Sequence, residues 1–445
     1  MADYGFFAAL AHLISTAALE ALSHLRRCPR GCKPRLPGAS FLQALLFHFL
    51  FATGTFAEHL RQLTGWIRSE SGLSERRQAA SWQLFTSWLG QALRPMAKSD
   101  LNPTAFWRGW RLLAWDGSQF SLTNTPQVKQ QACKARARRR RAAWAKVTVA
   151  VLLELGLHNP LAAAIGYQGQ SEYVLTQQLL AALTPRSLLL ADRLTGCPAL
   201  LYPLYCQVLA LGSHFLVRVR KNLTVLKRRR LADGSSLIEV AFRNPWCQRD
   251  VLATFTLREI VVRARRRGFR PQTIRLWTTL LDPATAPALE LAQLYTQRWE
   301  QELYFRQLKL ELRRSEVLQS HTPETAAQEV AMLVLATALL AQERARAAAG
   351  KLPVLEVSFV KCVDLLRPLW LVLALAGQLL STEQRQALCA AVYQEIQACR
   401  KAKRRQRSCA RAVRQPIKGW PRLLQPKYAH GRWKYSVLSQ PAKKK

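Results

Sequence analysis

Residues Leu291–Arg313 read LAQLYTQRWEQELYFRQLKLELR, a run without proline or glycine. This run predicts one amphipathic helix. At about 100° per residue, Arg298, Glu302 and Lys309 fall within roughly 60° of one another and form a polar stripe. Apolar residues border the stripe, namely Trp299, Leu303 and Leu310 on one side and Leu294, Phe305 and Leu312 on the other. We therefore expect Glu302 to face the body of the protein. The face expected to meet solvent carries Gln297, Glu300, Tyr304, Gln307 and Glu311.

A carboxylate that faces inward must be paired, protonated or bound to a metal, because an uncompensated buried charge is expensive. One reading is that Glu302 pairs with Arg298 and Arg306, each four residues away on the same helix. The spacing Tyr295-x2-Arg298-x3-Glu302-x6-Lys309 is more specific than that reading requires. It resembles the Tyr-Arg-Glu-Lys signature of one branch of the DDE-class insertion-sequence transposases, the insertion-sequence-four-like branch. In that family the Glu is the third catalytic carboxylate, so two aspartates should lie upstream.

Two short apolar runs end in aspartate, RLLAWD at Asp116 and SLLLAD at Asp192, in a chain with only eight aspartates. We expect each run to be a buried strand whose carboxylate emerges at its end. A single aspartate at a strand end is usually a turn residue. Two such aspartates followed by an inward-facing Glu302 indicate a set of three carboxylates that belong together. Strands are also expected at 147–155 and 161–167, with a helix at 171–183 between them and Asp192. This order is the layout of a ribonuclease H-like catalytic core, so the predicted fold class is α/β.

The family resemblance covers residues 110 to 345 and includes WDGS around Asp116 and LADR around Asp192. It implies a cut-and-paste DNA transposase, which cleaves at transposon ends and joins the freed 3′ hydroxyl to target DNA. Asp116, Asp192 and Glu302 would then be the catalytic residues and would hold two Mg²⁺ ions, with Mn²⁺ as a possible substitute.

The same resemblance implies DNA-binding residues. Tyr295, Arg298 and Lys309 would hold the phosphates of the transposon end. Relatives with a β-rich insertion use a tryptophan before this helix to hold a flipped base. The ungapped match to that position is Ile274, and Trp277, three residues further on, is the candidate for the role. The implied partner is double-stranded DNA, both transposon ends and target, bound by a homodimer.

Composition agrees with a polyanionic partner, because 66 Lys and Arg against 27 Asp and Glu give a net charge of +39. The longest apolar runs, 41–56 and 369–380, fall short of the roughly 20 residues that span a bilayer, and the N-terminus carries no basic segment of a secretory signal. We therefore expect no membrane partner and a cytoplasmic, nucleoid-associated protein.

Among ten cysteines only Cys28-x3-Cys32 approaches a zinc-ligand spacing, and no second pair completes it.

The expected domain organisation has six segments. Residues 1–105 form a helical N-terminal domain that binds DNA, with an exposed basic loop at Arg26–Gly38. Residues 106–212 are the first part of the ribonuclease H-like core, 213–283 a β-rich insertion, and 284–349 the completion of the core. Residues 350–399 are C-terminal helices, interrupted at Pro368. Residues 400–445, with sixteen basic residues and no acid, form a tail suited to a phosphate backbone.

Two other functions are compatible with these residues. The first is a ribonuclease H-like nuclease that performs no strand transfer. The second is an inactivated transposase derivative that only binds DNA, against which the intact set of three carboxylates argues.

Overall fold

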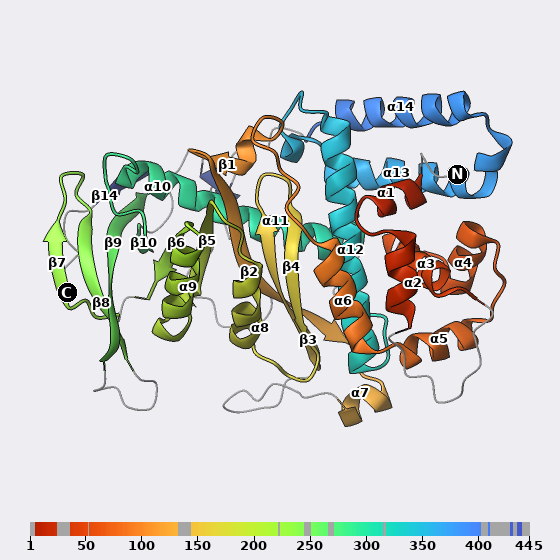
Figure 1. Cartoon of the computed structure of the whole chain (residues 1–445), viewed down its shortest axis with the longest axis horizontal. Coiled ribbons are helices and arrows are strands. Elements are labelled where there is room, and N and C mark those ends of the chain that lie inside the picture. Colours follow the sequence, from red (N-terminus) through yellow and green to blue (C-terminus); the bar gives the residue numbers. More distant parts are fainter. Residues whose placement is uncertain are drawn as a thin grey trace. The chain divides into compact units, whose positions relative to one another are not determined.

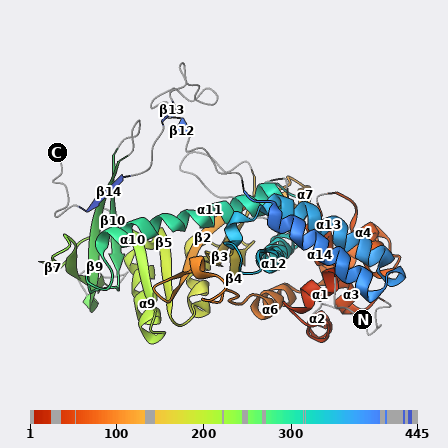
Figure 2. The ribbon, with the colours of Figure 1, turned by 90° about the horizontal axis from the view of Figure 1, so that it is seen from above.

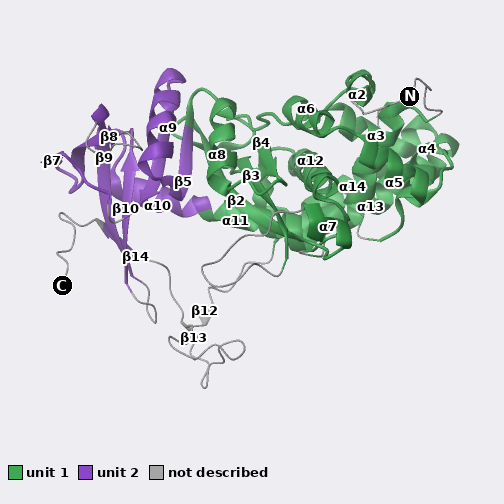
Figure 3. Ribbon diagram, turned by 90° about the horizontal axis from the view of Figure 1, so that it is seen from below, with its two compact units in different colours: residues 1–187, 299–401 green, residues 188–298, 402–445 purple. Residues whose placement is uncertain are grey.

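The computed structural model describes residues 5–24, 36–51, 53–131, 144–220, 223–243, 251–265, 271–313, 315, 317–401 and the short pieces 408–409, 428–429 and 434–437. Three expected features lie largely outside these residues: the Arg26–Gly38 loop with Cys28 and Cys32, most of the basic run Lys134–Lys146, and most of the basic tail. The chain divides into unit 1, residues 1–187 and 299–401, and unit 2, residues 188–298 and 402–445, as coloured in Figure 3.

The first hundred residues of unit 1 form six helices: α1 (Phe6–Ala11), α2 (Thr16–Ser23), α3 (Gly38–Leu50), α4 (Phe56–Thr64), α5 (Glu70–Ala79) and α6 (Trp82–Ala92). Hydroxyl side chains begin four of them, because Ser15, Thr55, Ser69 and Ser81 each accept a hydrogen bond from an amide of the first turn. Helix α3 is buried along almost its whole length.

The helix α12 (Pro323–Ala348) is the core of unit 1 and packs against α3, α6 and the strand β4. It is the one helix in the described part of the chain that is long and apolar enough to cross a bilayer, which we did not expect from the sequence. The protein buries 94% of its most apolar 18-residue window, as it would a core helix. The helices α13 (Phe359–Ala376) and α14 (Thr382–Ala398) follow. The predicted break at Pro368 is wrong, because α13 continues through that exposed position, where water can satisfy the carbonyl that proline leaves without an amide.

The sheet of unit 1 has the antiparallel order β4 (Asn159–Gly166), β3 (Lys146–Glu154), β2 (Trp110–Leu122), with β1 (Phe106–Trp107) and β11 (Val317–Leu318) also paired to β2. The helix α7 (Pro126–Gln131) follows β2, and α8 (Glu172–Gln178) packs against β2, β3 and β4, next to which it is drawn in Figure 1. Apart from the short α7, the chain order is strand, strand, strand and helix before the next strand, as the sequence predicts.

Unit 2 contains a second run of strands, in the order β5 (Ser187–Gly196), β6 (His214–Val219), β10 (Gln272–Thr278), β9 (Val251–Arg265), β8 (Ser236–Arg243), β7 (Lys227–Arg230). β5 and β6 are parallel, and the remaining neighbours are antiparallel. The helix α9 (Pro198–Ala210) connects β5 to β6. From the expected tail, the strand β14 (Lys434–Val437) pairs with β9.

The stretch that opens the sequence analysis is helical from Ala288 to Leu312 but is not one regular α-helix. It consists of α10 (Ala288–Leu294), a 3-10 turn η3 (Tyr295–Arg298), α11 (Trp299–Arg306) and a π-helical segment η4 (Gln307–Leu312). The division between the two units falls between Arg298 and Trp299. Changes of winding of this kind are frequent at functional sites.

Candidate active site

The orientation of the helical run differs from the one predicted. Glu302 is only half-buried, and Trp299 and Leu310, expected to face inward, are 57% and 50% exposed. Tyr304 and Gln307, expected to face solvent, are buried. The prediction failed because it assumed one α-helical phase throughout and counted polar residues as exposed.

The buried polar residues of the run have partners inside unit 1. Tyr304 shares a hydrogen bond with Thr337 of α12, at 2.9 Å between the two hydroxyl oxygens. Gln307 Oε1 lies 2.8 Å from His158 Nδ1, and His158 Nε2 lies 2.8 Å from Glu300 Oε2. Burial lowers the pKa of His158 against the opposing effect of Glu300. A neutral imidazole donates through only one of its two ring nitrogens, so donation to Glu300 leaves Nδ1 as an acceptor and requires the Gln307 amide to present its nitrogen instead of its oxygen.

Asp116 does not end its strand, as the sequence predicts, but lies in the middle of β2, which continues to Leu122. It is half-buried, and its cross-strand partner on β3 is Val151. Asp192 likewise lies inside β5, four residues before the strand ends at Gly196. The strand β2 extends because the residues after Asp116 keep pairing with β3 as far as Ser121.

The direction of the Asp116 side chain follows from its neighbours. The amide of Gly117 donates to Glu172 Oε1 at 3.1 Å, and a Cβ on Gly117 would lie 2.3 Å from Glu172 Cδ, so position 117 faces α8. Because successive residues of a strand point to opposite faces, Asp116 points to the other face, together with Phe120. In Figure 3, α8 and α11 lie on opposite sides of β2 and β3.

The helical run crosses this second face, as Figure 2 shows for α11 beside β2 and β3. Lys309 Nζ donates to the carbonyl of Gln119 at 2.7 Å and lies 4.9 Å from the centre of the Phe120 ring. Gln301, the residue before Glu302, donates to the carbonyl of Val151, the cross-strand partner of Asp116. Glu302 therefore lies near the level of Asp116.

Asp116 and Glu302 offer only oxygen ligands, the type that Mg²⁺ prefers. Within the described residues, no group of three or more His, Cys, Asp or Glu side chains is arranged to hold a metal ion. Magnesium in proteins commonly takes one or two carboxylates and completes its shell with water and substrate phosphates. The donor chemistry of the pair in unit 1 fits that pattern.

Unit 2 gathers charged residues around Asp192. Tyr295 is buried, its hydroxyl donates to the carbonyl of Ala191 at 3.2 Å, and burial raises its pKa to about 12. Arg298 and Arg218 oppose this rise in the pKa of Tyr295. Burial also lowers the pKa of Arg218, whose charge interacts with Asp192 and Arg193. Tyr295, Arg298 and Asp192, which the sequence assigns to the site, are thus neighbours within this unit.

Sequence reasoning missed three residues beside these. Glu172 reaches the amide next to Asp116, Arg218 lies on β6 near Tyr295, and Gln301 is buried next to Glu302. The HFLVRVR alternation marks Arg218 as an arginine within a strand, but nothing in the sequence links it to Asp192. Glu172 and Gln301 carry no sequence signal that separates them from surface residues.

Trp277, the candidate for holding a flipped base, is enclosed within unit 2 in this structure. It is 0% exposed, although it borders a cavity of about 360 Å³, and its indole Nε1 donates to Glu259 Oε1 at 3.0 Å. The β alternation of TIRLWTT places Trp277 on the buried face of β10, whereas Ile274 is half-buried. The structure therefore assigns Trp277 to the core of unit 2.

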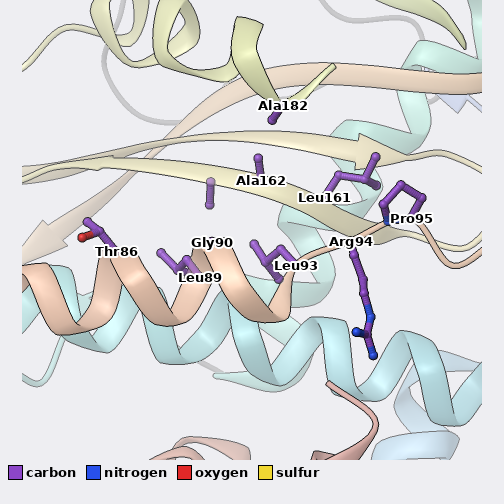
Figure 4. Close-up of a pocket in the computed structure, with 10 residues that line it drawn as sticks. Thr86, Leu89, Gly90, Leu93, Arg94, Pro95, Leu161, Ala162 and Ala182 are labelled. Atoms are coloured by element: carbon purple, nitrogen blue, oxygen red, sulfur yellow. The ribbon is translucent and has the colours of Figure 1, made fainter. Parts of the chain in front are cut away.

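A second cavity of about 360 Å³ lies in unit 1, between α6 and β4 (Figure 4). No carboxylate borders it, and Arg94 is the one charged residue of its lining among the described residues. It therefore lacks the groups for metal-dependent chemistry. The lining consists of Thr86, Leu89, Gly90, Leu93, Arg94, Pro95, Leu161, Ala162, Ala163 and Ala182.

Comparisons with known proteins show which family the chain resembles. The chain is similar to the transposase InsG of insertion sequence element IS4 from Escherichia coli (strain K12), with 27% identity over 242 residues, 53% of this chain and 53% of that protein. It is also 30% identical over 118 residues to InsZ of the same organism, named as a candidate transposase, covering 26% of this chain and 39% of InsZ. The chain thus spans about half the length of the curated relatives it matches, or less.

A cryo-EM structure of the piggyBac transposase, in a synaptic complex with hairpin DNA, is similar with a TM-score of 0.44 and 9% identity, over 87% of this chain and 83% of that chain. So distant a likeness does not locate individual residues. The family model "Transposase DDE domain" matches residues 107–339, more than half of the 445 residues and a range that contains Asp116, Asp192 and Glu302. The chain belongs to the family of transposases with a DDE domain.

Proposed function

We propose that this protein is a DNA transposase that cleaves DNA at the ends of its element and joins the 3′ hydroxyl to target DNA in a cut-and-paste reaction. The observation that carries the proposal is the DDE-domain match over residues 107–339, which spans all three carboxylates expected to be catalytic. The proposed core has the ribonuclease H-like fold, which the order β2, β3, β4, α8, β5 supports.

The proposed catalytic residues are Asp116, Asp192 and Glu302. Two Mg²⁺ ions, or Mn²⁺ in their place, would activate the attacking oxygen and stabilise the leaving oxygen of an in-line phosphoryl transfer. The three carboxylates would hold the ions and keep the scissile phosphate in line. Asp116 and Phe120 lie on the same face of β2, and the helix that carries Glu302 and Lys309 crosses that face. This supports the assignment for Asp116 and Glu302.

Tyr295, Arg298 and Lys309 are proposed to hold the phosphates of the transposon end. Arginine suits phosphate because its planar guanidinium donates two parallel hydrogen bonds, and lysine has three donors, of which Gln119 takes one from Lys309. The buried Tyr295 would stay protonated at neutral pH, since its pKa is about 12, and its one O–H donor would have to turn from the carbonyl of Ala191 to reach a phosphate. The net charge of +39 would add sequence-independent affinity.

We further propose that two copies act together on a pair of transposon ends, that the working partner is double-stranded DNA and that the protein acts in the cytoplasm at the nucleoid. The six-segment domain organisation, with DNA binding by residues 1–105 and a β-rich insertion at 213–283, belongs to the same proposal. The strands β6 to β10 lie within residues 213–283 and support the β-rich insertion.

The experiment begins with the DNA that flanks the gene, from which inverted repeats bounded by a short duplication give the end sequence. Purified protein is then incubated with Mg²⁺, a plasmid and either an uncut or a pre-cut end. The proposal expects cleavage of the uncut end and covalent joining of the pre-cut end to the plasmid. Cleavage without joining would identify a nuclease, and end binding without either reaction would identify an inactive derivative.

A further inference from the structure

Gln301 is a buried polar residue that neither the motif nor the proposed chemistry accounts for. It immediately precedes Glu302 on α11 and is 0% exposed. Its Nε2 donates to the carbonyl of Val151 at 3.2 Å, while its Oε1 is buried without a hydrogen-bond partner among the described residues. A buried amide whose oxygen has no hydrogen-bond partner is costly. An apolar residue of similar size would fill the same space without that cost.

The partner of Gln301 has a defined relation to the site. Val151 of β3 is the cross-strand neighbour of Asp116 on β2. The hydrogen bond therefore fastens the helical run to the sheet at the level of Asp116. The bond joins the residue that precedes Glu302 on the helix to the strand that pairs with β2 at Asp116.

The winding of the run explains why such an anchor is needed. A 3-10 turn precedes α11 and a π-helical segment follows it. A 3-10 turn winds more tightly than an α-helix and a π turn more loosely. The direction of Glu302 is therefore not set by regular winding from either end, and contacts made by α11 itself must set it. Tyr304 of α11 binds α12 through Thr337, and Glu300 binds His158 in the turn between β3 and β4. Gln301 is the α11 side chain shown to hydrogen-bond to the strand beside Asp116.

We propose that Gln301 is a positioning residue, which fixes the rotation of α11 so that Glu302 meets Asp116 in the geometry that metal binding requires. The proposal rests on the proposed function. Magnesium demands near-ideal octahedral geometry, and removal of a group that orients a metal ligand typically lowers metal affinity or activity by about 10- to 100-fold. A displaced Glu302 would therefore appear first in the Mg²⁺ dependence of cleavage.

The test compares the full-length wild type with Gln301→Met and Gln301→Leu, which keep the volume and remove the donor. Gln328→Leu is the matched control, because Gln328 is also 0% exposed and its Nε2 donates to the carbonyls of Arg77 and Ala80, which belong to the α5 region. Three quantities are measured on each protein: melting temperature, affinity for the transposon end without metal, and cleavage rate as a function of Mg²⁺ concentration.

We expect both Gln301 variants to keep end affinity and to need about 10- to 100-fold more Mg²⁺ for half-maximal cleavage, or to cleave that much more slowly. The control should lower the melting temperature without changing the half-saturating Mg²⁺ concentration. If the Gln301 variants cleave with the wild-type Mg²⁺ dependence, or lose stability and end binding together with cleavage, Gln301 has a packing role and the inference is wrong. Absence of Mg²⁺-dependent cleavage by the wild type would instead contradict the proposed function itself.

Discussion

Lys309 Nζ donates to the backbone carbonyl of Gln119 at 2.7 Å, which ties the last residue of the Tyr-Arg-Glu-Lys spacing to the strand that carries Asp116. The ammonium group also lies over the Phe120 ring. This residue is held in place before any DNA is bound. Its remaining donors can reach a phosphate without the entropic cost of ordering a free lysine side chain.

Glu302→Gln should abolish Mg²⁺-dependent cleavage and preserve both end binding and melting temperature, because the amide keeps the shape of the side chain and removes the charge that would hold the metal. Melting temperature and cleavage are measured on the same sample. If Glu302 served only to neutralise nearby arginines, the variant would melt earlier and the folded fraction would still cleave. A folded, active variant would rule out the catalytic assignment.

Arg298→Ala and Lys309→Ala should each weaken the complex with the transposon end by about 10- to 150-fold, which corresponds to the loss of one charge-assisted hydrogen bond of about 1.5 to 3 kcal/mol. Affinity is measured by titration at fixed salt, without metal. Lys351→Ala, at an exposed position, removes the same charge elsewhere and is the control. An equal loss in the control would mean that only total charge matters.

The histidine pair of the N-terminal helices should make the protein sensitive to acid. His48 Nδ1 lies 2.9 Å from His59 Nδ1, and burial, together with His59 and Arg77, lowers the pKa of His48 to about 3. The unfolded chain takes up a proton near pH 6.5, whereas the folded chain does not. Stability from this residue is therefore complete above pH 6.5 and declines as the pH falls from there towards 3.

His48→Phe, which keeps a ring in the same space, should reduce the fall in melting temperature between pH 7 and pH 5. His24→Phe, at an exposed position, should leave that fall unchanged. Thermal unfolding at a series of pH values tests both variants. An unaltered pH dependence in His48→Phe would show that other groups control acid unfolding.

Trp277→Phe should lower stability and leave end binding unchanged, because the indole is buried and hydrogen-bonded to Glu259. Loss of a hydrogen bond to a carboxylate costs about 1.5 to 3 kcal/mol of unfolding free energy. Denaturant unfolding and DNA titration give the two quantities. Weaker end binding with normal stability would restore a role for Trp277 on the DNA.

The sequence was sufficient for the order of elements and the family, because strands and helices of this chain follow the periodicity of their apolar residues. It was insufficient for the direction of side chains on the helical run. A 3-10 turn at Tyr295–Arg298 and a π-helical segment at Gln307–Leu312 change the angular spacing, and neither has a signature in the residues themselves. Buried partners such as His158 and Thr337 are also distant in sequence from Gln307 and Tyr304.

The same reason explains why the strand end predicted at Asp116 was wrong and why the burial of Trp277 was not foreseen. An aspartate after an apolar run ends a strand in most contexts, but here the pairing with β3 continues to Ser121. The tryptophan of β10 was assigned by its place in a family pattern, whereas its burial depends on the strands on either side of it. Both outcomes depend on the pairing of strands that are distant in sequence, and a local sequence pattern contains no information on that pairing. The convergence of Asp116, Asp192 and Glu302 stays a prediction.

Gly117 has a consequence for how the protein tolerates mutation. Any side chain at this position would place a carbon 2.3 Å from the carboxyl carbon of Glu172, so the Glu172 side chain would have to turn away and give up the hydrogen bond from the Gly117 amide. In a library of all single substitutions selected for transposition, position 117 should accept alanine better than Asp116 accepts asparagine, because a flexible, half-buried side chain can move aside. Two adjacent residues of one strand would then differ in what selection reads from them, the space beside Glu172 at one and a negative charge at the other.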